Sequence, residues 1–271
     1  MFSVIFQYQF IQNAIIASLF ASVVCGIIGV IIVEKKMLMM GGGIAHTALG
    51  GVGLGYFLGF EPIFGAVGFS VLAALGIGVV RKKGGASSDV AIALFWSLGM
   101  ALGIIFIALT PGYPPDINSY LFGNILSVAR VDLYLTLVMT IIVLTLIIVF
   151  YHDWEAWLFD EEFAAVAGIA VTFLEFTMLV LVALTVVTLI RVVGIIMVIA
   201  LLSAPAATAA FFTKKLKARM VLAVLFALVS CLGGLWISYA WNIATGAVII
   251  ICCISFYIIS FFIQRIMKEN L

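Results

Sequence analysis

Long apolar runs dominate this sequence and constrain its fold more than any other feature. Of the 271 residues, 66% are apolar and 9% are charged, and the mean hydropathy is +1.37. An ordinary soluble domain has about 45–50% apolar and about 25% charged residues. A soluble chain of this size cannot hide so much apolar surface from water. The composition therefore excludes a soluble enzyme, a nucleic-acid-binding module and a disordered tail, and it predicts a protein embedded in a lipid bilayer.

The apolar runs are long enough to be membrane-spanning helices. A helix needs about 20 apolar residues to cross the hydrocarbon core, and runs such as 135–150 do not alternate as the strands of a membrane barrel would. The sequence predicts an all-α, polytopic membrane helix bundle with a single domain over residues 1–271. About nine spans are expected, or eight if the chain does not divide around Arg191. The expected spans are residues 9–33, 37–60, 63–80, 90–110, 131–151, 167–190, 192–213, 219–241 and 244–264.

The basic residues predict the orientation of the bundle. Short cytoplasmic loops are enriched in lysine and arginine. With nine spans, eleven of the thirteen basic residues fall on one side of the membrane. We therefore expect the N-terminus outside and the C-terminus in the cytoplasm. The eleven residues are Lys35, Lys36, Arg81, Lys82, Lys83, Lys214, Lys215, Lys217, Arg219, Arg265 and Lys268.

The loop at residues 151–166 differs from the other cytoplasmic segments. It carries five acidic residues and no lysine or arginine. Four aromatic residues, Trp154, Trp157, Phe159 and Phe163, are interleaved with the acids. The pattern is consistent with a surface that docks another protein, or with an amphipathic helix whose aromatic rings lie at the lipid headgroups.

A second segment, 118–130, is too short and too broken to cross the membrane. It follows a proline-rich loop that the predicted topology places outside the cell. We expect a re-entrant or interfacial helix there, which is tolerated only where protein or a water-filled cavity covers its backbone.

His46 and Glu175 are ionisable residues inside the predicted spans. An ionisable side chain at membrane depth is by default a hypothesis of function. The imidazole of His46 suits zinc and similar metals, although a histidine hydrogen-bonded to a neighbouring helix is the other interpretation. One histidine is too few for a stable zinc site, but a transport pathway can use a sparse site. Glu175 is expected near the cytoplasmic end of its span, and a place on the pathway is the alternative.

Glycine and proline residues predict local features of two spans. Gly51, Gly55 and Gly59 recur every four residues, which favours close approach of another helix along one face. Pro205 removes a backbone donor from the seventh span and predicts a kink or a break there.

Five segments carry a family resemblance through their consistent order. They are GGGIAHTALGGVGLGYFLG (41–59), SDVAIALFWSLGMALGI (88–104), LFGNILSV (121–128), LFDEEFAAVAGI (158–169) and RVVGIIMVIALLSAPAATA (191–209). Through them the chain resembles the integral-membrane permeases of the zinc/manganese ATP-binding-cassette importer family, over nearly its whole length.

The resemblance implies partners and a division of labour. It implies a homodimer of permeases, a dimer of cytoplasmic ATP-binding-cassette ATPases and an extracellular metal-binding receptor protein. This chain lacks the phosphate-binding loop G-x-x-x-x-G-K-[ST]. We therefore expect a transport subunit that is not an enzyme, has no covalently bound cofactor and binds no nucleic acid, with ATP bound by the partner.

The resemblance also implies roles for particular residues. His46 matches the histidine of the metal motif in the family's second span. The segment 158–169 resembles the cytoplasmic coupling helix that contacts the ATPase, which favours the docking interpretation for a set of four residues. These are Phe159, Asp160, Glu161 and Glu162.

One position departs from the family pattern. Many relatives carry an aspartate one helical turn before the histidine, where this chain has Gly42. Residues four apart share a helix face, so such a pair could hold a metal together. Loss of the hard oxygen ligand mildly favours zinc over manganese. Met39, on roughly the same face as His46, is a soft candidate ligand.

The sequence thus predicts the permease subunit of an ATP-driven importer for a divalent transition metal in a prokaryotic cell membrane. Zinc is the favoured ion and manganese is allowed. Alternatives are a permease for a metal chelate such as a siderophore or cobalamin, a secondary carrier driven by an ion gradient, and a membrane scaffold that transports nothing. A carrier of the secondary class often shows inverted repeats and intramembrane acids.

Overall fold

The computed structural model describes residues 8–83, 88–112, 123, 125 and 128–269, and within these ranges the chain is helical with no strand. The predicted re-entrant segment 118–130 lies mostly outside the described residues. The helices are α2 (Gln9–Glu34), α3 (Leu38–Leu58), α4 (Pro62–Lys83), α5 (Ser88–Leu109), α7 (Arg130–Val149), α8 (Tyr151–Phe159), α9 (Glu161–Val166), α10 (Val171–Val193), α11 (Ile195–Phe212), α12 (Leu216–Trp241) and α13 (Thr245–Glu269).

Each of the nine predicted spans coincides with one long helix. Within the described ranges, eight of these helices are long and apolar enough to cross a membrane. The remaining one is α3, which has sufficient length at 21 residues but is rich in glycine and contains His46. The prediction of a polytopic helical membrane protein is confirmed, and the long helix outside this set of eight is the one that carries His46.

The division between the sixth and seventh spans occurs at a glycine. Gly194 separates α10 from α11 and has φ 78° and ψ 161°. A positive φ of this kind favours glycine because it has no Cβ atom. The backbone of Gly194 also lies against Gly123, which itself has φ 60°. Arg191 therefore lies in the last turn of α10, and the sixth and seventh spans are separate helices.

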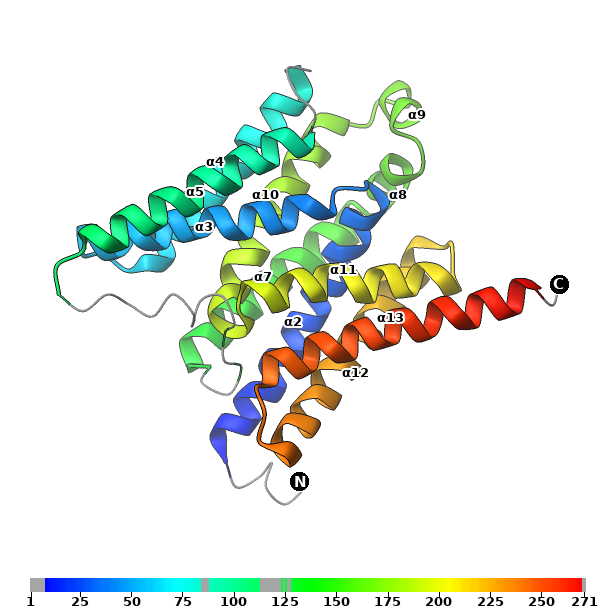
Figure 1. Cartoon of the computed structure of the whole chain (residues 1–271). Coiled ribbons are helices and arrows are strands. Elements are labelled where there is room, and N and C mark those ends of the chain that lie inside the picture. The colour runs from blue at the N-terminus through cyan, green and yellow to red at the C-terminus, as the bar shows by residue number, and fades with distance from the viewer. Residues whose placement is uncertain (1–7, 84–87, 113–122, 124, 126–127, 270–271) are drawn as a thin grey trace.

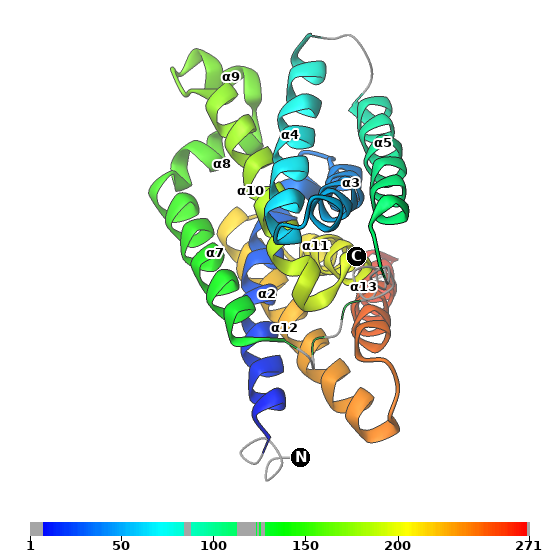
Figure 2. The same ribbon diagram turned by 90° about the vertical axis from the view of Figure 1, so that its left-hand side faces the viewer.

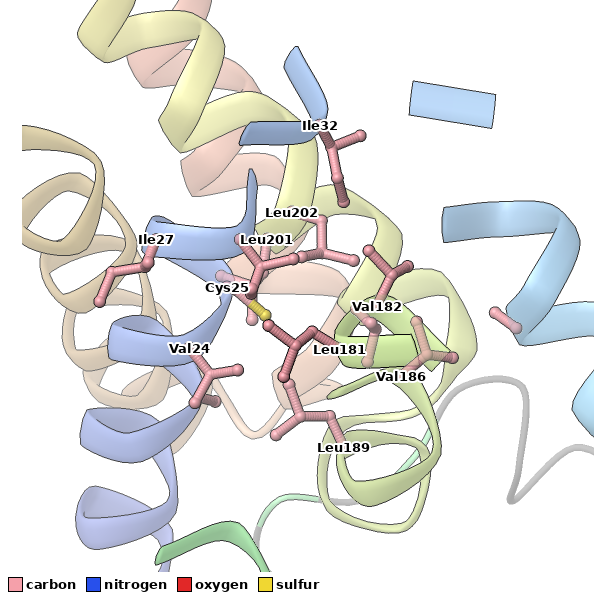
Figure 3. Packing of buried hydrophobic residues seen from close by; sticks show 14 of the residues in the cluster. Val24, Cys25, Ile27, Ile32, Leu181, Val182, Val186, Leu189, Leu201 and Leu202 are labelled. Atoms are coloured by element: carbon pink, nitrogen blue, oxygen red, sulfur yellow. The ribbon is translucent and has the colours of Figure 1, made fainter. Parts of the chain in front are cut away.

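The helices pack in two groups that α10 joins. Figure 1 shows α3, α4 and α5 lying side by side, apart from α11, α12 and α13. In Figure 1, α2 passes behind α11 in the middle of the molecule, and Figure 2 shows α7 along the other side of α2. Side chains from α2, α10 and α11 meet in one packing centre, among them Cys25, Leu181 and Leu202 (Figure 3).

Glycines on α3 allow the neighbouring helix α4 to approach its backbone closely. Gly51 lies directly against the Gly65 carbonyl of α4, and a Cβ atom at Gly55 would lie 2.6 Å from Pro62 Cα. These two contacts agree with the predicted glycine face. The prediction that Gly59 belongs to this face is wrong, because a Cβ atom there would meet nothing within 4 Å. Gly59 instead ends α3, with φ 75°, a conformation typical of a helix C-cap.

Pro205 lies inside α11 and does not end it. The helix is continuous from Ile195 to Phe212. A proline cannot donate to the carbonyl four residues earlier, and two residues before it Ser203 Oγ donates to the Ile199 carbonyl at 2.8 Å. The predicted break therefore does not occur. Of the two outcomes predicted for this position, the kink remains a prediction.

Candidate metal pathway and coupling surface

His46 lies near the middle of α3 and stacks on an aromatic ring from α5. The ring centroids of His46 and Trp96 are 4.3 Å apart and their planes differ by 7°. The His46 side chain is partly exposed, but its Nδ1 atom is buried and has no hydrogen-bond partner among the described residues. A buried polar atom without a partner is costly. It therefore marks a place where a ligand would be stabilised.

The contact between α3 and α5 fixes the position of this ring pair. Thr47, next to the histidine, donates its hydroxyl to the Gly43 carbonyl at 2.7 Å and to the Phe95 carbonyl of α5 at 3.0 Å. Trp96 Nε1 donates to Met100 Sδ at 3.2 Å. The indole is thus held at both its edge and its face, and it forms one wall beside His46.

Gly42 leaves space beside this pair. A Cβ atom at Gly42 would lie 3.5 Å from Ile199 Cδ1 and 3.9 Å from Trp96 Cζ3, which are ordinary van der Waals distances. Met39 follows the same helix face by its spacing, and its side chain is 57% exposed. The backbone of α3 therefore brings Met39, Gly42 and His46 to one face, with Trp96 beside them.

One copy of the chain supplies few ligands. In the part of the chain that the structure describes, no group of three or more His, Cys, Asp or Glu side chains could hold a metal ion. A structural zinc site takes four protein ligands and a catalytic one takes three. Within a single chain, the described residues therefore do not give His46 the further ligands of a complete metal site.

Glu175 lies elsewhere, on α10, and is paired. Its Oε1 atom is 3.3 Å from Arg81 Nη1 at the end of α4, and its side chain is 12% exposed. Arg81 also donates to Met37 Sδ at 2.9 Å. The structure therefore does not bring Glu175 together with His46, and the ion pair accounts for how a carboxylate is accommodated at this place.

The predicted coupling segment folds into two short helices joined at an acidic cap. Asp160 lies between α8 and α9, and its Oδ1 atom accepts a hydrogen bond from the Phe163 amide at 3.0 Å. Lys35, just after α2, pairs with Glu161 at 2.9 Å, and its Nζ atom also donates to the Trp157 carbonyl at 3.0 Å. The segment is thus attached to the end of α2.

The aromatic residues of this segment divide into two sets. Trp154 and Trp157 are 0% and 1% exposed, so they anchor the segment in the bundle. Phe159 is 90% exposed and Phe163 is 65% exposed, as is Val166 at 89%. An exposed apolar patch beside acidic side chains is typical of a surface that binds another protein. We call Phe159, Phe163 and Val166 the coupling patch.

Ion pairs distinguish the two ends of the bundle. One end of the bundle carries the paired basic residues Lys35, Arg81 and Arg219. Arg219 pairs with Glu34 there. This is the end that carries α8 and α9, in agreement with the placement of these basic residues on one side of the membrane.

At the opposite end a single arginine joins three segments. Arg191 Nη1 is 3.2 Å from Glu61 Oε1, and Arg191 Nε is 3.4 Å from Asp132 Oδ1. Sequence reasoning did not single out Asp132, although an acid at the start of an apolar run was the available signal. It also missed Trp96, which no motif distinguishes from a packing residue.

These features define a class of protein: a multi-pass helical membrane protein with a histidine inside one of its long helices and an exposed apolar patch at one end of the bundle. Comparison with protein-family models gives the family. The chain belongs to the ABC 3 transport family, whose model matches residues 7–264.

Individual relatives cover almost the whole chain. The membrane protein slr2045 of Synechocystis is 43% identical over 96% of this chain and 92% of its own length. The manganese transport system membrane protein MntC of Listeria monocytogenes is 38% identical over 94% of this chain and 91% of its own length. The solved structure of PsaBC from Streptococcus pneumoniae in complex with Fab has a TM-score of 0.88 and 35% identity, covering 100% of this chain and 98% of that chain.

The family membership confirms the resemblance inferred from the sequence. The chain is a metal-importer permease of the ATP-binding-cassette class and an integral protein of the cell membrane. A permease subunit of this class is not itself catalytic. The chelate permease and the ion-gradient carrier are not favoured.

Proposed function

We propose that this permease imports a divalent transition metal and that His46 lies on the translocation pathway. The observation that carries the proposal is the buried Nδ1 atom of His46, which has no partner among the described residues and lies beside the stacked Trp96 ring. Neutral imidazole is a good ligand for borderline metals. A single strong ligand suits transport because the ion must leave the site as readily as it enters.

Zinc is the ion that the side chains favour. Gly42 provides no carboxylate on the face of His46, and the remaining nearby candidate, Met39, offers a soft sulfur. Hard oxygen donors suit manganese, whereas imidazole suits zinc. Manganese is the second candidate, and it is supported by the names of two relatives, MntC of Listeria monocytogenes and ScaB of Streptococcus gordonii.

We propose that two copies of the chain form the pathway. One copy has no group of three ligands among its described residues, and a symmetric pair would present two His46 side chains to one axis. Such closed twofold symmetry is the commonest form of homo-oligomer. An extracellular receptor protein would deliver the ion, with the N-terminus outside and the C-terminus in the cytoplasm.

The energy for transport would come from a separate ATPase dimer that binds the coupling patch. Phe159 and Phe163 are exposed at the end of the bundle that carries Lys35 and Arg81. The segment between them in the sequence carries the acidic residues Asp160, Glu161 and Glu162. Movement of α8 and α9 would reach the bundle through the buried Trp154 and Trp157.

Uptake of radioactive zinc and manganese into vesicles tests the proposal. The vesicles contain the full chain with its ATPase, the receptor outside and ATP inside. We expect ATP-dependent uptake of at least one of these ions, with zinc preferred when both are supplied. Uptake of a metal chelate but of neither free ion would contradict the proposal, as would uptake that an ion gradient drives without ATP.

A further inference from the structure

An apolar groove of about 560 Å³ lies between α2, α7 and α12. Figure 2 shows α7 and α12 beside α2, away from α5. The groove floor consists of Ile27, Ile147 and Met220, each less than 9% exposed. Its walls include Ile148, which is 71% exposed, and Val221, which is 53% exposed. The groove is therefore open toward the outside of the bundle.

The lining residues form a stripe along each helix. On α12 the groove follows positions 217, 220, 221, 224 and 225, on α7 it follows 144, 147 and 148, and it continues to Tyr151 at the start of α8. Residues three and four apart share a helix face. At about 1.5 Å per residue, the stripe on α12 extends for about 12 Å from Lys217. The groove thus has the elongated shape that suits a hydrocarbon chain.

Polar groups are confined to one end of the groove. Among its lining residues, Lys217 and Tyr151 lie at this end, where α12 begins and α7 ends. Lys217 is exposed. The Tyr151 hydroxyl donates to Glu155 Oε1 at 3.3 Å, and nearby Arg219 is paired with Glu34. Lys217 is therefore the lining residue that carries a positive charge at this end of the groove.

We propose that the groove between α2, α7 and α12 binds an anionic phospholipid of the bilayer, with one acyl chain along the stripes and the phosphate at Lys217. The apolar lining excludes a polar ligand over most of the groove. Basic residues at the cytoplasmic end of membrane helices attract anionic headgroups, and Lys217 belongs to the cluster Lys214, Lys215, Lys217 and Arg219. The proposal rests on the membrane fold and does not depend on which ion is transported.

Native mass spectrometry of the full chain tests this proposal. The chain is purified in detergent with equal amounts of phosphatidylglycerol and phosphatidylcholine, and the bound lipid is counted. We expect the parent chain to retain phosphatidylglycerol in preference to phosphatidylcholine. Lys217→Glu is expected to reduce that preference about fivefold, which corresponds to about 1 kcal/mol. Val221→Trp, a change at an exposed wall residue, is expected to reduce binding of both lipids by filling the groove.

Lys83→Glu is the matched control, because Lys83 is an exposed lysine at the same end of the bundle on α4, which does not line the groove. It should retain the parent preference. Equal binding of the two lipids by the parent would overturn the proposal, as would an equal loss in Lys83→Glu and Lys217→Glu. A Val221→Cys chain that cross-links to a second copy in phosphatidylglycerol vesicles would also overturn it, since the groove would then be a subunit interface.

Discussion

The imidazole of His46 and the indole of Trp96 are stacked, with centroids 4.3 Å apart and planes within 7° of parallel. The two residues come from different helices, α3 and α5. A stacked pair of this kind restricts the rotation of the imidazole, so its nitrogen atoms keep one direction. Groups that orient a metal-binding histidine affect metal affinity although they do not touch the ion.

Replacement of Trp96 should therefore impair transport. We expect Trp96→Ala to lower the rate of ATP-dependent metal uptake about tenfold, the scale of effect seen for residues that orient metal ligands. Trp96→Phe, which keeps an aromatic face, should restore much of the rate. The matched control is Trp236→Ala on α12, whose side chain is 57% exposed. Equal uptake by Trp96→Ala and Trp236→Ala would show that the stack has no functional role.

An aspartate at Gly42 should change the choice of metal. The nearest side-chain atoms to a Cβ there are 3.5 Å away or more, so a Cβ atom fits without displacing a neighbour. Gly42→Asp adds a hard oxygen on the face of His46, and it should raise the ratio of manganese to zinc uptake. Gly42→Asn, of the same shape but uncharged, is the control. The account is wrong on this point if both variants take up manganese and zinc in the same ratio as the parent.

Close packing between α3 and α4 should make Gly51 intolerant of a side chain. A Cβ atom at Gly51 would collide with the Gly65 carbonyl, which belongs to the helix backbone and cannot rotate away. We expect Gly51→Ala to cost about 1–3 kcal/mol and to lower the thermal unfolding midpoint in detergent. Gly68→Ala on α4 is the control, since a Cβ atom there meets nothing within 4 Å. The prediction fails if the two variants unfold at the same temperature.

The coupling patch should carry the affinity for the ATPase. Phe159 and Phe163 are exposed, so their truncation removes little of the packing that holds the fold. Loss of an aromatic anchor at an interface typically costs about 2 kcal/mol, or about thirtyfold in affinity. We expect Phe159→Ala and Phe163→Ala each to weaken co-purification with the ATPase by this factor.

Phe64→Ala provides the control for the coupling patch. Phe64 is 71% exposed and begins α4 near Glu61, at the opposite end of the bundle. Its replacement should leave ATPase binding unchanged. Charge reversal at Asp160, Glu161 and Glu162 together is also expected to prevent binding. This variant also removes two contacts within the chain, because Asp160 caps α9 and Glu161 pairs with Lys35. Retention of the ATPase by both phenylalanine variants would refute the assignment.

The helical framework could be predicted from the sequence because lipid imposes simple requirements on length and polarity. Apolar runs of sufficient length placed all nine long helices, and the short polar segments between them set the boundaries within a few residues. The division at Gly194 was less certain, since the apolar character continues across it. A single glycine with positive φ separates α10 from α11 there.

The site was less predictable because its geometry depends on pairs of helices. The sequence indicated His46, but nothing in the run around Trp96 showed that this ring would stack on it. The partner of Glu175 was also missed, since Arg81 is distant in sequence and reaches it only through the packing of α4 against α10. In residues 151–166, composition alone did not reveal that the tryptophans are buried and the phenylalanines exposed.

The most direct test of the central claim is ATP-dependent zinc uptake by His46→Ala in vesicles that contain the ATPase and the receptor. Thr140→Val serves as the control, since it also removes a buried polar group from a span. Among the described residues, the Thr140 hydroxyl bonds within α7, to the Thr136 carbonyl at 2.7 Å. We predict that His46→Ala folds and binds the ATPase. In the presence of ATP its zinc uptake should fall to the background rate that is measured without ATP, while Thr140→Val should take up zinc at the parent rate. Parent-level zinc and manganese uptake by His46→Ala would contradict the account, because the ion would then cross the membrane without this histidine.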